Sequence, residues 1–248
     1  LAEVGDQVPL ISGVYADGSL EAARLAAMAD KEGASALLVF PPNSLSMGGQ
    51  LRPEMAMAHF RRIADATDLP IIVFQYPMAG GLGYPFETLL QLFDRVPTIQ
   101  AIKDWSNDAM LHERHIRTFQ HLPRPVNVLT THSSWLMASL TMGPNGLLSG
   151  AGSVIADLQV ALFRAVQAGD LKVAQAVNDR IVPLSQVFYA PPFLDMHNRM
   201  KEALVLMGKL PRAVVRPPLV KIGDAEIARI REALIEAGLL DISARNAA

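Results

Sequence analysis

Residues 99–104 read Ile99-Gln100-Ala101-Ile102-Lys103-Asp104. The first four form a short apolar run, which Lys103 ends, and Asp104 and a helix-like stretch follow. An ammonium group at the carboxyl end of a buried strand either pairs with an acid or loses its charge and becomes a nucleophile. Two interpretations therefore stay open: an ion pair with Asp104, or an amine that forms an imine with a carbonyl substrate. The other lysines lie in helix-like or loop-like segments where we expect them to be solvated: Lys31, Lys172, Lys201, Lys209 and Lys221.

Short apolar runs alternate with amphipathic stretches on both sides of this segment, which is typical of repeated βα units with a parallel sheet. We expect strands at residues 8–14, 36–40, 71–75, 98–103, 126–131 and 146–149. Helices are expected between them at residues 20–32, 53–66, 85–93, 108–119, 134–142 and 155–168. Asp17, Gly18 and Ser19 are expected to cap the first helix, and Gly33 to end it.

Beyond Gly169 the pattern is helical, with helices expected at residues 171–188, 195–207 and 224–237. We therefore predict residues 1–168 as the portion with βα units and residues 169–248 as a helical region packed on it or at a subunit interface. Six βα units fit neither a closed eight-unit barrel nor, without a phosphate-binding loop, an open doubly wound sheet. The glycine-rich segment 146–153 lacks the ending of a phosphate loop, and remains either a small-residue strand or a cradle for a carboxylate.

Composition narrows the classes of function. The chain has 248 residues, half of them apolar, a net charge of −2 and no cysteine. No basic cluster suggests nucleic acid or an anionic membrane as a partner, no apolar stretch is long enough to cross a bilayer, and disulfides are excluded. The first residues lack the features of a signal peptide, so we expect a cytoplasmic protein. The charge pattern favours small neutral or anionic metabolites as its ligands.

Together these segments resemble the dihydrodipicolinate synthase and N-acetylneuraminate lyase family of class I aldolases, over essentially the whole chain. Residues 10–27 resemble the family's third βα unit, residues 36–41 its fourth strand, and residues 70–77 its fifth. Residues 101–104 match the sixth strand, residues 143–154 the glycine-containing eighth, and the helical tail the family's C-terminal helices.

The resemblance implies a (β/α)₈ TIM barrel with a C-terminal helical extension and a Schiff base on Lys103. It implies a lyase or aldolase that acts on pyruvate or another 2-oxo acid, with no metal and no organic cofactor, in a homo-oligomer (dimer or tetramer). The family's first two βα units would precede Leu1, so we expect the sequence to be truncated at its start. The family's Thr-Thr-Gly-Glu type loop, which binds the substrate carboxylate, would lie in that part.

Three positions depart from the family pattern. Phe74 stands where the family has a proton-shuttling tyrosine, Asn43 where the synthase has a second tyrosine, and Ala79 near the place of an arginine. Another group must therefore act as acid and base, and the candidates at strand ends are Tyr15, Tyr76, His132 and Ser133, with Tyr76 and His132 preferred. The substrate pocket is expected to be shaped by Phe74, Asn43, Leu148, Ser149 and Gly150.

Several alternatives stay open. The protein could be a true 4-hydroxy-tetrahydrodipicolinate synthase, an oxo-sugar-acid aldolase or dehydratase, or a ligand-binding homologue that has lost turnover, which Phe74 and Asn43 would also explain. An unrelated barrel enzyme with a metal site is disfavoured, because few acidic residues and histidines lie at strand ends. The sequence does not identify the acceptor aldehyde or the direction of the reaction.

Overall fold

The computed structural model describes residues 3–5, 7–241 and 243. The chain divides into two compact units: unit 1 comprises Leu1–His132 and Met142–Leu148, and unit 2 comprises Ser133–Thr141 and Ser149–Ala248. The predicted domain boundary between residues 168 and 169 stays a prediction. Residues 1–2, at the start of the first predicted domain, and residues 244–248, at the end of the second, lie outside the described residues.

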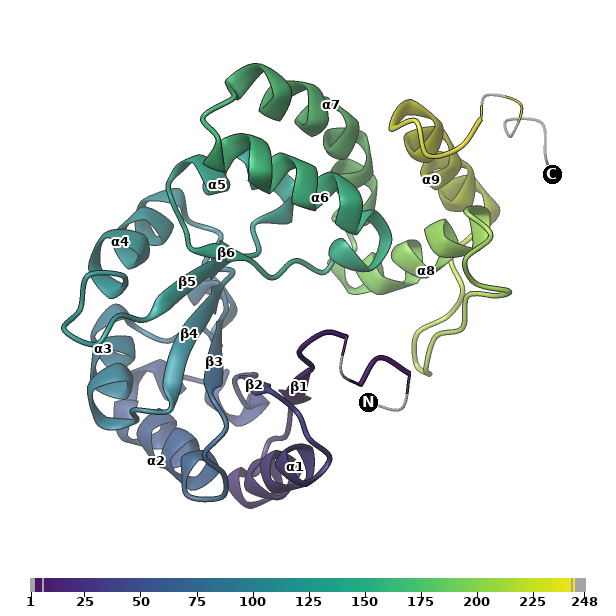
Figure 1. The fold of residues 1–248 in the computed structure, drawn as a ribbon. Helices are drawn as coiled ribbons and strands as arrows, with labels where there is room; N and C mark the ends of the chain where they lie inside the picture. Colours follow the sequence, from purple (N-terminus) through teal and green to yellow (C-terminus); the bar gives the residue numbers. More distant parts are fainter. Residues whose placement is uncertain (1–2, 6, 242, 244–248) are drawn as a thin grey trace. The chain divides into compact units, whose positions relative to one another are not determined.

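Unit 1 is built on a parallel sheet (Figure 1). Its six described strands lie side by side in sequence order: β1 (Ile11–Val14), β2 (Ala36–Val39), β3 (Ile71–Gln75), β4 (Ile99–Asp104), β5 (Asn127–Thr130) and β6 (Gly146–Leu147). A doubly wound sheet reverses its strand order at a switch point, whereas a (β/α) barrel keeps it. The unbroken order therefore confirms the predicted α/β class and favours the barrel type.

Helices connect the strands of unit 1 and lie along the outer side of the sheet in Figure 1. They are α1 (Ser19–Lys31), α2 (Pro53–Ala64), α3 (Phe86–Arg95) and α4 (Ala109–Phe119). Three short 3₁₀ helices lie in the loops after β2 and β3: η1 (Asn43–Leu45), η2 (Gly49–Leu51) and η3 (Met78–Gly80). The predicted strands and helices are thus confirmed, with ends that shift by a few residues.

The core of unit 1 forms where the strands meet these helices. Every residue of β3 is buried, as expected of a parallel strand covered on both faces. Helix α3 supplies Leu89, Leu92 and Phe93 at helical spacing, and all three are buried against the same core. This packing fixes the strands whose carboxyl ends carry the candidate residues.

The expected cap of α1 is wrong in detail. Gly18 is the residue before the helix, and no side chain caps it. The Asp17 carboxylate accepts the backbone N–H of Asn43 at 2.7 Å instead, and Ser19 Oγ lies 3.0 Å from Nδ1 of His59. Asp17 and Ser19 thus contact residues that are distant in the sequence, Asn43 and His59, and the residues around the helix start do not indicate these contacts. Gly33 ends the helix as predicted, with a φ of 85°.

Unit 2 is helical. It contains η4 (Ser133–Trp135), α5 (Leu136–Thr141), α6 (Gly152–Gln167), α7 (Leu171–Phe188), η5 (Phe193–Asp195), α8 (Met196–Leu206) and α9 (Asp224–Glu236). Helix α7 packs against both α6 and α9, and α8 packs against α9. The fully buried Arg199 of α8 pairs with Glu226 of α9, which ties the two helices together. No helix within the described residues is long and apolar enough to span a membrane.

Candidate active site

Lys103 lies near the carboxyl end of β4, directly opposite Phe74 in the register with β3. Its amine nitrogen is 4.1 Å from the centroid of the Phe74 ring, over the ring face. Burial lowers the pKa of the Lys103 amine from 10.5 to about 8. The strand therefore holds an amine that is much closer to neutrality at physiological pH than a solvated lysine is.

Asp104 points to the opposite face of β4, because successive residues of a strand alternate in direction. Its fully buried carboxylate lies 2.7 Å from Nδ1 of His112 and 2.8 Å from Nδ1 of His115, both on α4. Burial opposes ionisation, but the hydrogen bonds from the two histidines hold the pKa of Asp104 well below its usual range. Of the two interpretations left open for Lys103, the ion pair with Asp104 is therefore not the one that the structure shows.

Asp104 also does not cap the following helix. Asp108 is the capping residue, because its carboxylate accepts the backbone N–H of Leu111 at 3.0 Å. The other oxygen of Asp104 accepts the backbone N–H of Ser106 at 2.8 Å. Asp104 thus anchors the end of β4 to its own loop and to α4.

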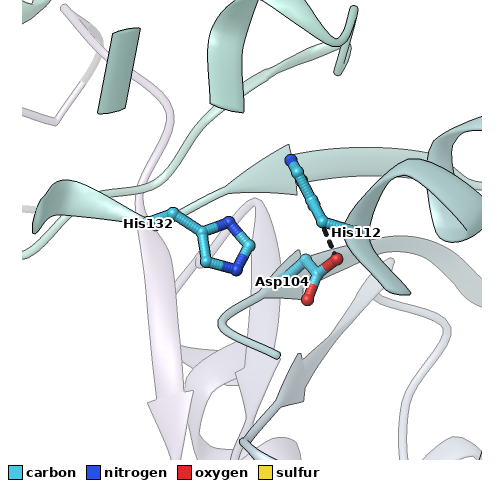
Figure 2. A group of neighbouring side chains, drawn as sticks. All are labelled: Asp104, His112 and His132. Atoms are coloured by element: carbon cyan, nitrogen blue, oxygen red, sulfur yellow. Dashed lines mark hydrogen bonds and ion pairs between the residues drawn. The ribbon is translucent and has the colours of Figure 1, made fainter. Parts of the chain in front are cut away.

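His132 lies beside this cluster, after β5, and is buried (Figure 2). Its Nε2 lies 3.2 Å from the backbone N–H of Asn107, which can only donate, so Nε2 accepts and the ring proton lies on Nδ1 near the hydroxyl of Thr130. Burial lowers the pKa of His132 to about 4, against a smaller opposing effect of Asp104. The structure places His132 on the Asp104 face of β4, where its Nε2 accepts a hydrogen bond from Asn107 in the loop after β4.

Asp104, His112 and His132 also form the one group in the described residues whose ligand atoms lie close enough for a shared cation, within 4.8 Å of one another. Nitrogen and carboxylate donors suit zinc. A cation would have to replace the proton between His112 and Asp104 and displace the Asn107 amide from His132. The hydrogen bonds account for this buried group without a cation.

A row of contacting aromatic side chains lies on the Lys103 face of the sheet, and Phe74 is the member that contacts Lys103. The ring of Phe74 lies 4.6 Å from that of Tyr76, and Tyr76 lies 5.3 Å from Trp105. On the other side Phe74 contacts Phe40 at 5.1 Å, and Phe40 contacts Tyr15 at 5.6 Å. Burial, and secondarily Tyr15, raises the pKa of Tyr76, which keeps its hydroxyl protonated. The structure thus brings Tyr76 and Phe74 together near Lys103.

Asn43 lies at the start of η1, exposed, and its side-chain amide donates to the hydroxyl of Tyr15 at 2.8 Å. Asn43 is therefore linked to the row of aromatic side chains through the hydroxyl of Tyr15. Ala79 lies in η3, in the exposed loop after β3. Leu148 follows β6, where its backbone N–H donates to the carbonyl of Thr130 at 2.9 Å.

Ser149 and Gly150 belong to unit 2. The hydroxyl of Ser149 lies 2.7 Å from that of Ser133 and accepts the side-chain amide of Gln159 at 2.8 Å. A Cβ added at Gly150 would lie 3.9 Å from the hydroxyl of Tyr189. The structure thus joins Ser149 to Ser133, and their predicted roles in a substrate pocket stay predictions.

Four residues near the carboxyl end of β4 were not predicted from the sequence: Phe40, Trp105, His112 and His115. Phe40 and Trp105 follow their strands directly, and Trp105 lies two residues after Lys103, the spacing that places it on the same face. His112 and His115 are three residues apart, so they share one face of α4. The sequence spacing indicates in each case which side chains share a face. It does not indicate which face of α4 packs against β4.

Fold and site together define a class: parallel α/β proteins that present a half-buried lysine amine at the carboxyl ends of the strands. Comparison with known proteins is more specific. The model of the dihydrodipicolinate synthetase family matches residues 1–237. The chain therefore belongs to the dihydrodipicolinate synthetase family, as its sequence predicted, and this is a lyase family.

Two curated relatives are each 31% identical to this chain. The 4-hydroxy-tetrahydrodipicolinate synthase of Nitrobacter hamburgensis matches over 242 residues, 96% of this chain and 77% of the relative. The synthase of Symbiobacterium thermophilum matches over 241 residues with the same coverage, 96% and 77%.

Solved structures agree on the fold. Dihydrodipicolinate synthase from Thermotoga maritima has a TM-score of 0.85 at 24% identity, over 97% of this chain and 79% of that one. A prophage protein of the same family from E. coli K12, solved in complex with pyruvate, has a TM-score of 0.85 at 23% identity, over 96% and 78%. The described sheet and its helices are thus those of this family's TIM-barrel fold.

Proposed function

We propose that this protein is a class I lyase or synthase in which Lys103 forms an imine with pyruvate or a related 2-oxo acid. The observation that carries the proposal is the state of the Lys103 amine: it is half-buried on β4 and makes no ion pair within the described residues. The carboxylate of Asp104, the nearest acid in the sequence, is hydrogen-bonded to His112 and His115 instead. Family membership supports the same assignment.

The lowered pKa of Lys103, about 8, gives the amine the neutral form that attacks a ketone. At pH 7, about a tenth of such amines are neutral, against less than roughly 0.1% of solvated lysines. Attack on the C2 carbonyl and loss of water give an iminium ion, which draws electrons from C3 and allows a proton to leave there. The enamine that results adds to an aldehyde or, in the reverse direction, is released by cleavage.

Proton transfer in this mechanism is assigned to Tyr76, since Phe74 carries no exchangeable proton. Tyr76 is half-buried, and its raised pKa keeps the phenol in the donor form. Its ring is 4.6 Å from that of Phe74, which in turn lies under the Lys103 amine. His132 is a weaker candidate, because its nitrogens already serve Asn107 and Thr130.

The competing proposal is a ligand-binding homologue without turnover, which Phe74 favours. A homo-oligomer and a cytoplasmic location both stay predictions. A monomeric variant of dihydrodipicolinate synthase is among the matched structures, with a TM-score of 0.86.

The test is reductive trapping. The natural protein is incubated with pyruvate and sodium borohydride, and intact mass is measured for wild type, Lys103→Met and Lys31→Met. Lys31 ends α1 and is exposed, so Lys31→Met is the matched control. A covalent pyruvyl adduct in wild type and Lys31→Met, but not in folded Lys103→Met, supports the proposal. No adduct with pyruvate or with larger 2-oxo acids would overturn it and favour the binding protein.

A further inference from the structure

We propose that the second substrate of this site is an uncharged aromatic aldehyde, so that the product is a 4-hydroxy-2-oxo acid with an aryl group at C4. This inference rests on the proposed imine at Lys103 and goes beyond it by specifying the class of acceptor. It is carried by the aromatic residues next to the lysine and by the lack of charge in two of the adjoining loops.

The aromatic group consists of Tyr15, Phe40, Phe74, Tyr76 and Trp105. Its members come from the carboxyl ends of four consecutive strands, β1 to β4, and each ring contacts the next with centroids 4.6 to 5.6 Å apart. Lys103 lies over the central ring, that of Phe74. A molecule attached to Lys103 through an imine would therefore lie beside the Phe74 ring, from which the other rings extend, while Leu129 of β5 is the neighbour of Lys103 on its other side.

The rings on either side of Phe74 retain accessible surface. Tyr15 is 57% exposed, whereas Phe40, Tyr76 and Trp105 are half-buried. Phe74 itself is 7% exposed. Trp and Tyr side chains are rarely fully buried, so the grouping of these rings at one end of the sheet is the informative feature. Half-buried rings grouped at the reactive end of the sheet provide faces and edges on which an aryl group can stack.

The adjoining loops offer no charge to an anionic acceptor. Residues 40–51, after β2, and residues 76–85, after β3, contain no Lys, Arg, His, Asp or Glu. The acids in the loops after β1 and β4 are engaged with backbone N–H groups: Asp17 with that of Asn43, and Asp108 with that of Leu111. An aldehyde with its own carboxylate would lose hydration at these loops without gaining a cationic partner.

The polar groups that do lie here suit a neutral acceptor. Asn43 donates to the Tyr15 hydroxyl, and the Tyr76 hydroxyl remains protonated. Either phenol can donate to an aldehyde oxygen or to a hydroxyl on an aryl ring. The arrangement combines stacking surface with hydrogen bonding and requires no formal charge on the acceptor.

The reaction balances without an oxidant or a second cofactor. The enamine carbon, C3 of pyruvate, forms a bond to the aldehyde carbon, and the π electrons of the aldehyde C=O become an alkoxide that takes a proton. Water then adds to the iminium carbon, and the Lys103 amine leaves. One pyruvate and one aldehyde thus give one 4-hydroxy-2-oxo acid, and the reverse steps cleave it.

The experiment measures kcat/KM for condensation of pyruvate with three aldehydes: benzaldehyde (aromatic), propanal (neutral and aliphatic) and succinic semialdehyde (anionic). Products are quantified by mass spectrometry. We expect benzaldehyde to exceed each of the others by at least tenfold. Trp105→Leu should lower kcat/KM for benzaldehyde about tenfold and leave that for propanal within twofold. Trp135→Leu, at the other tryptophan of the sequence, is the matched control and should change neither.

Pyruvate trapping on every variant separates imine formation at Lys103 from the selection of the acceptor. If Lys103 traps pyruvate but succinic semialdehyde is the best acceptor, or if Trp105→Leu affects all aldehydes equally, the aromatic proposal is overturned and the imine stands. If pyruvate is not trapped at all, the proposed function fails and the acceptor proposal fails with it. Unchanged trapping in Trp105→Leu shows that the variant is folded and forms the imine, so that a lower kcat/KM for benzaldehyde alone reports acceptor selection.

Discussion

The Nζ atom of Lys103 lies 4.1 Å from the centroid of the Phe74 ring, and the two residues are neighbours in the register between β3 and β4. This pairing brings a cation to an aromatic face inside a half-buried site. The ring offers an attraction of about 1 kcal/mol to the charged amine. It does not replace the lost hydration, because burial still lowers the pKa of Lys103 to about 8.

The first prediction concerns the pH dependence of imine formation. The rate at which the protein traps pyruvate should rise about tenfold per pH unit below pH 8, since the neutral fraction of an amine grows in that proportion below its pKa. The rate should level off above about pH 8. Single-turnover trapping with cyanoborohydride, followed by intact mass between about pH 6 and 10, measures this profile. A rate that keeps rising to pH 10 would mean that Lys103 has the pKa of a solvated lysine.

The second prediction concerns stability. A lysine pKa lowered from 10.5 to about 8 means that the folded state holds the charged amine at a cost of about 3 kcal/mol. That cost is fully present below pH 8 and is relieved as the pH rises toward 10.5, because the unfolded chain then binds a proton that the folded chain has released. Lys103→Met should therefore raise the free energy of unfolding at pH 7, and the gain should shrink as the pH rises from about 8 to 10.5.

Urea unfolding at pH 7 and pH 10 measures this gain, with Lys31→Met as the control at an exposed lysine. A Lys103→Met variant that is less stable than wild type at pH 7 would contradict the assigned burial cost. Loss of imine formation accompanied by a gain in stability is what a functional lysine in an apolar site should give.

The third prediction separates proton transfer from imine formation. Tyr76→Phe should slow the exchange of the pyruvate methyl protons with D₂O about a hundredfold, because this exchange needs a group that moves protons at C3. Borohydride trapping should be unaffected. Proton NMR of pyruvate in D₂O measures the exchange without any aldehyde. Tyr84→Phe is the matched control, since the buried hydroxyl of Tyr84 has no hydrogen-bond partner within the described residues.

A second substitution tests whether the hydroxyl can be moved. Phe74→Tyr in the Tyr76→Phe background places a phenol on the strand position where family resemblance expects one, next to the Lys103 amine. Recovery of exchange would show that the site needs one phenol and tolerates two positions for it. Equal exchange in wild type and Tyr76→Phe would remove Tyr76 from the mechanism.

The sequence predicted the strands because their apolar runs are short and are separated by helix-like stretches. It predicted Lys103 at the end of β4 for the same reason. It missed the partners of Asp104, because α4 meets β4 through His112 and His115 and nothing local to Asp104 indicates that contact. Three members of the aromatic group, Tyr15, Phe74 and Tyr76, were among the predicted candidates. Phe40 and Trp105 were missed, because each follows a strand and only strand order and register bring their rings to the other three.

The fourth prediction concerns Asp104, which binds the end of β4 to α4. Asp104→Asn should lower the free energy of unfolding at pH 7 by about 3 kcal/mol, because the two buried histidine N–H groups lose a shared anionic acceptor. Asp108→Asn is the matched control, since Asn caps a helix about as well as Asp does.

The pKa of Asp104 is held well below its unfolded value of 3.8. Its contribution to stability is therefore complete above about pH 5 and is lost as the pH falls below 3.8 toward the folded pKa. Urea unfolding at several pH values between about 2.5 and 7 should show the gap between wild type and Asp104→Asn narrowing in acid. A gap that stays constant down to the lowest pH would mean that the carboxylate charge is not what stabilises this contact.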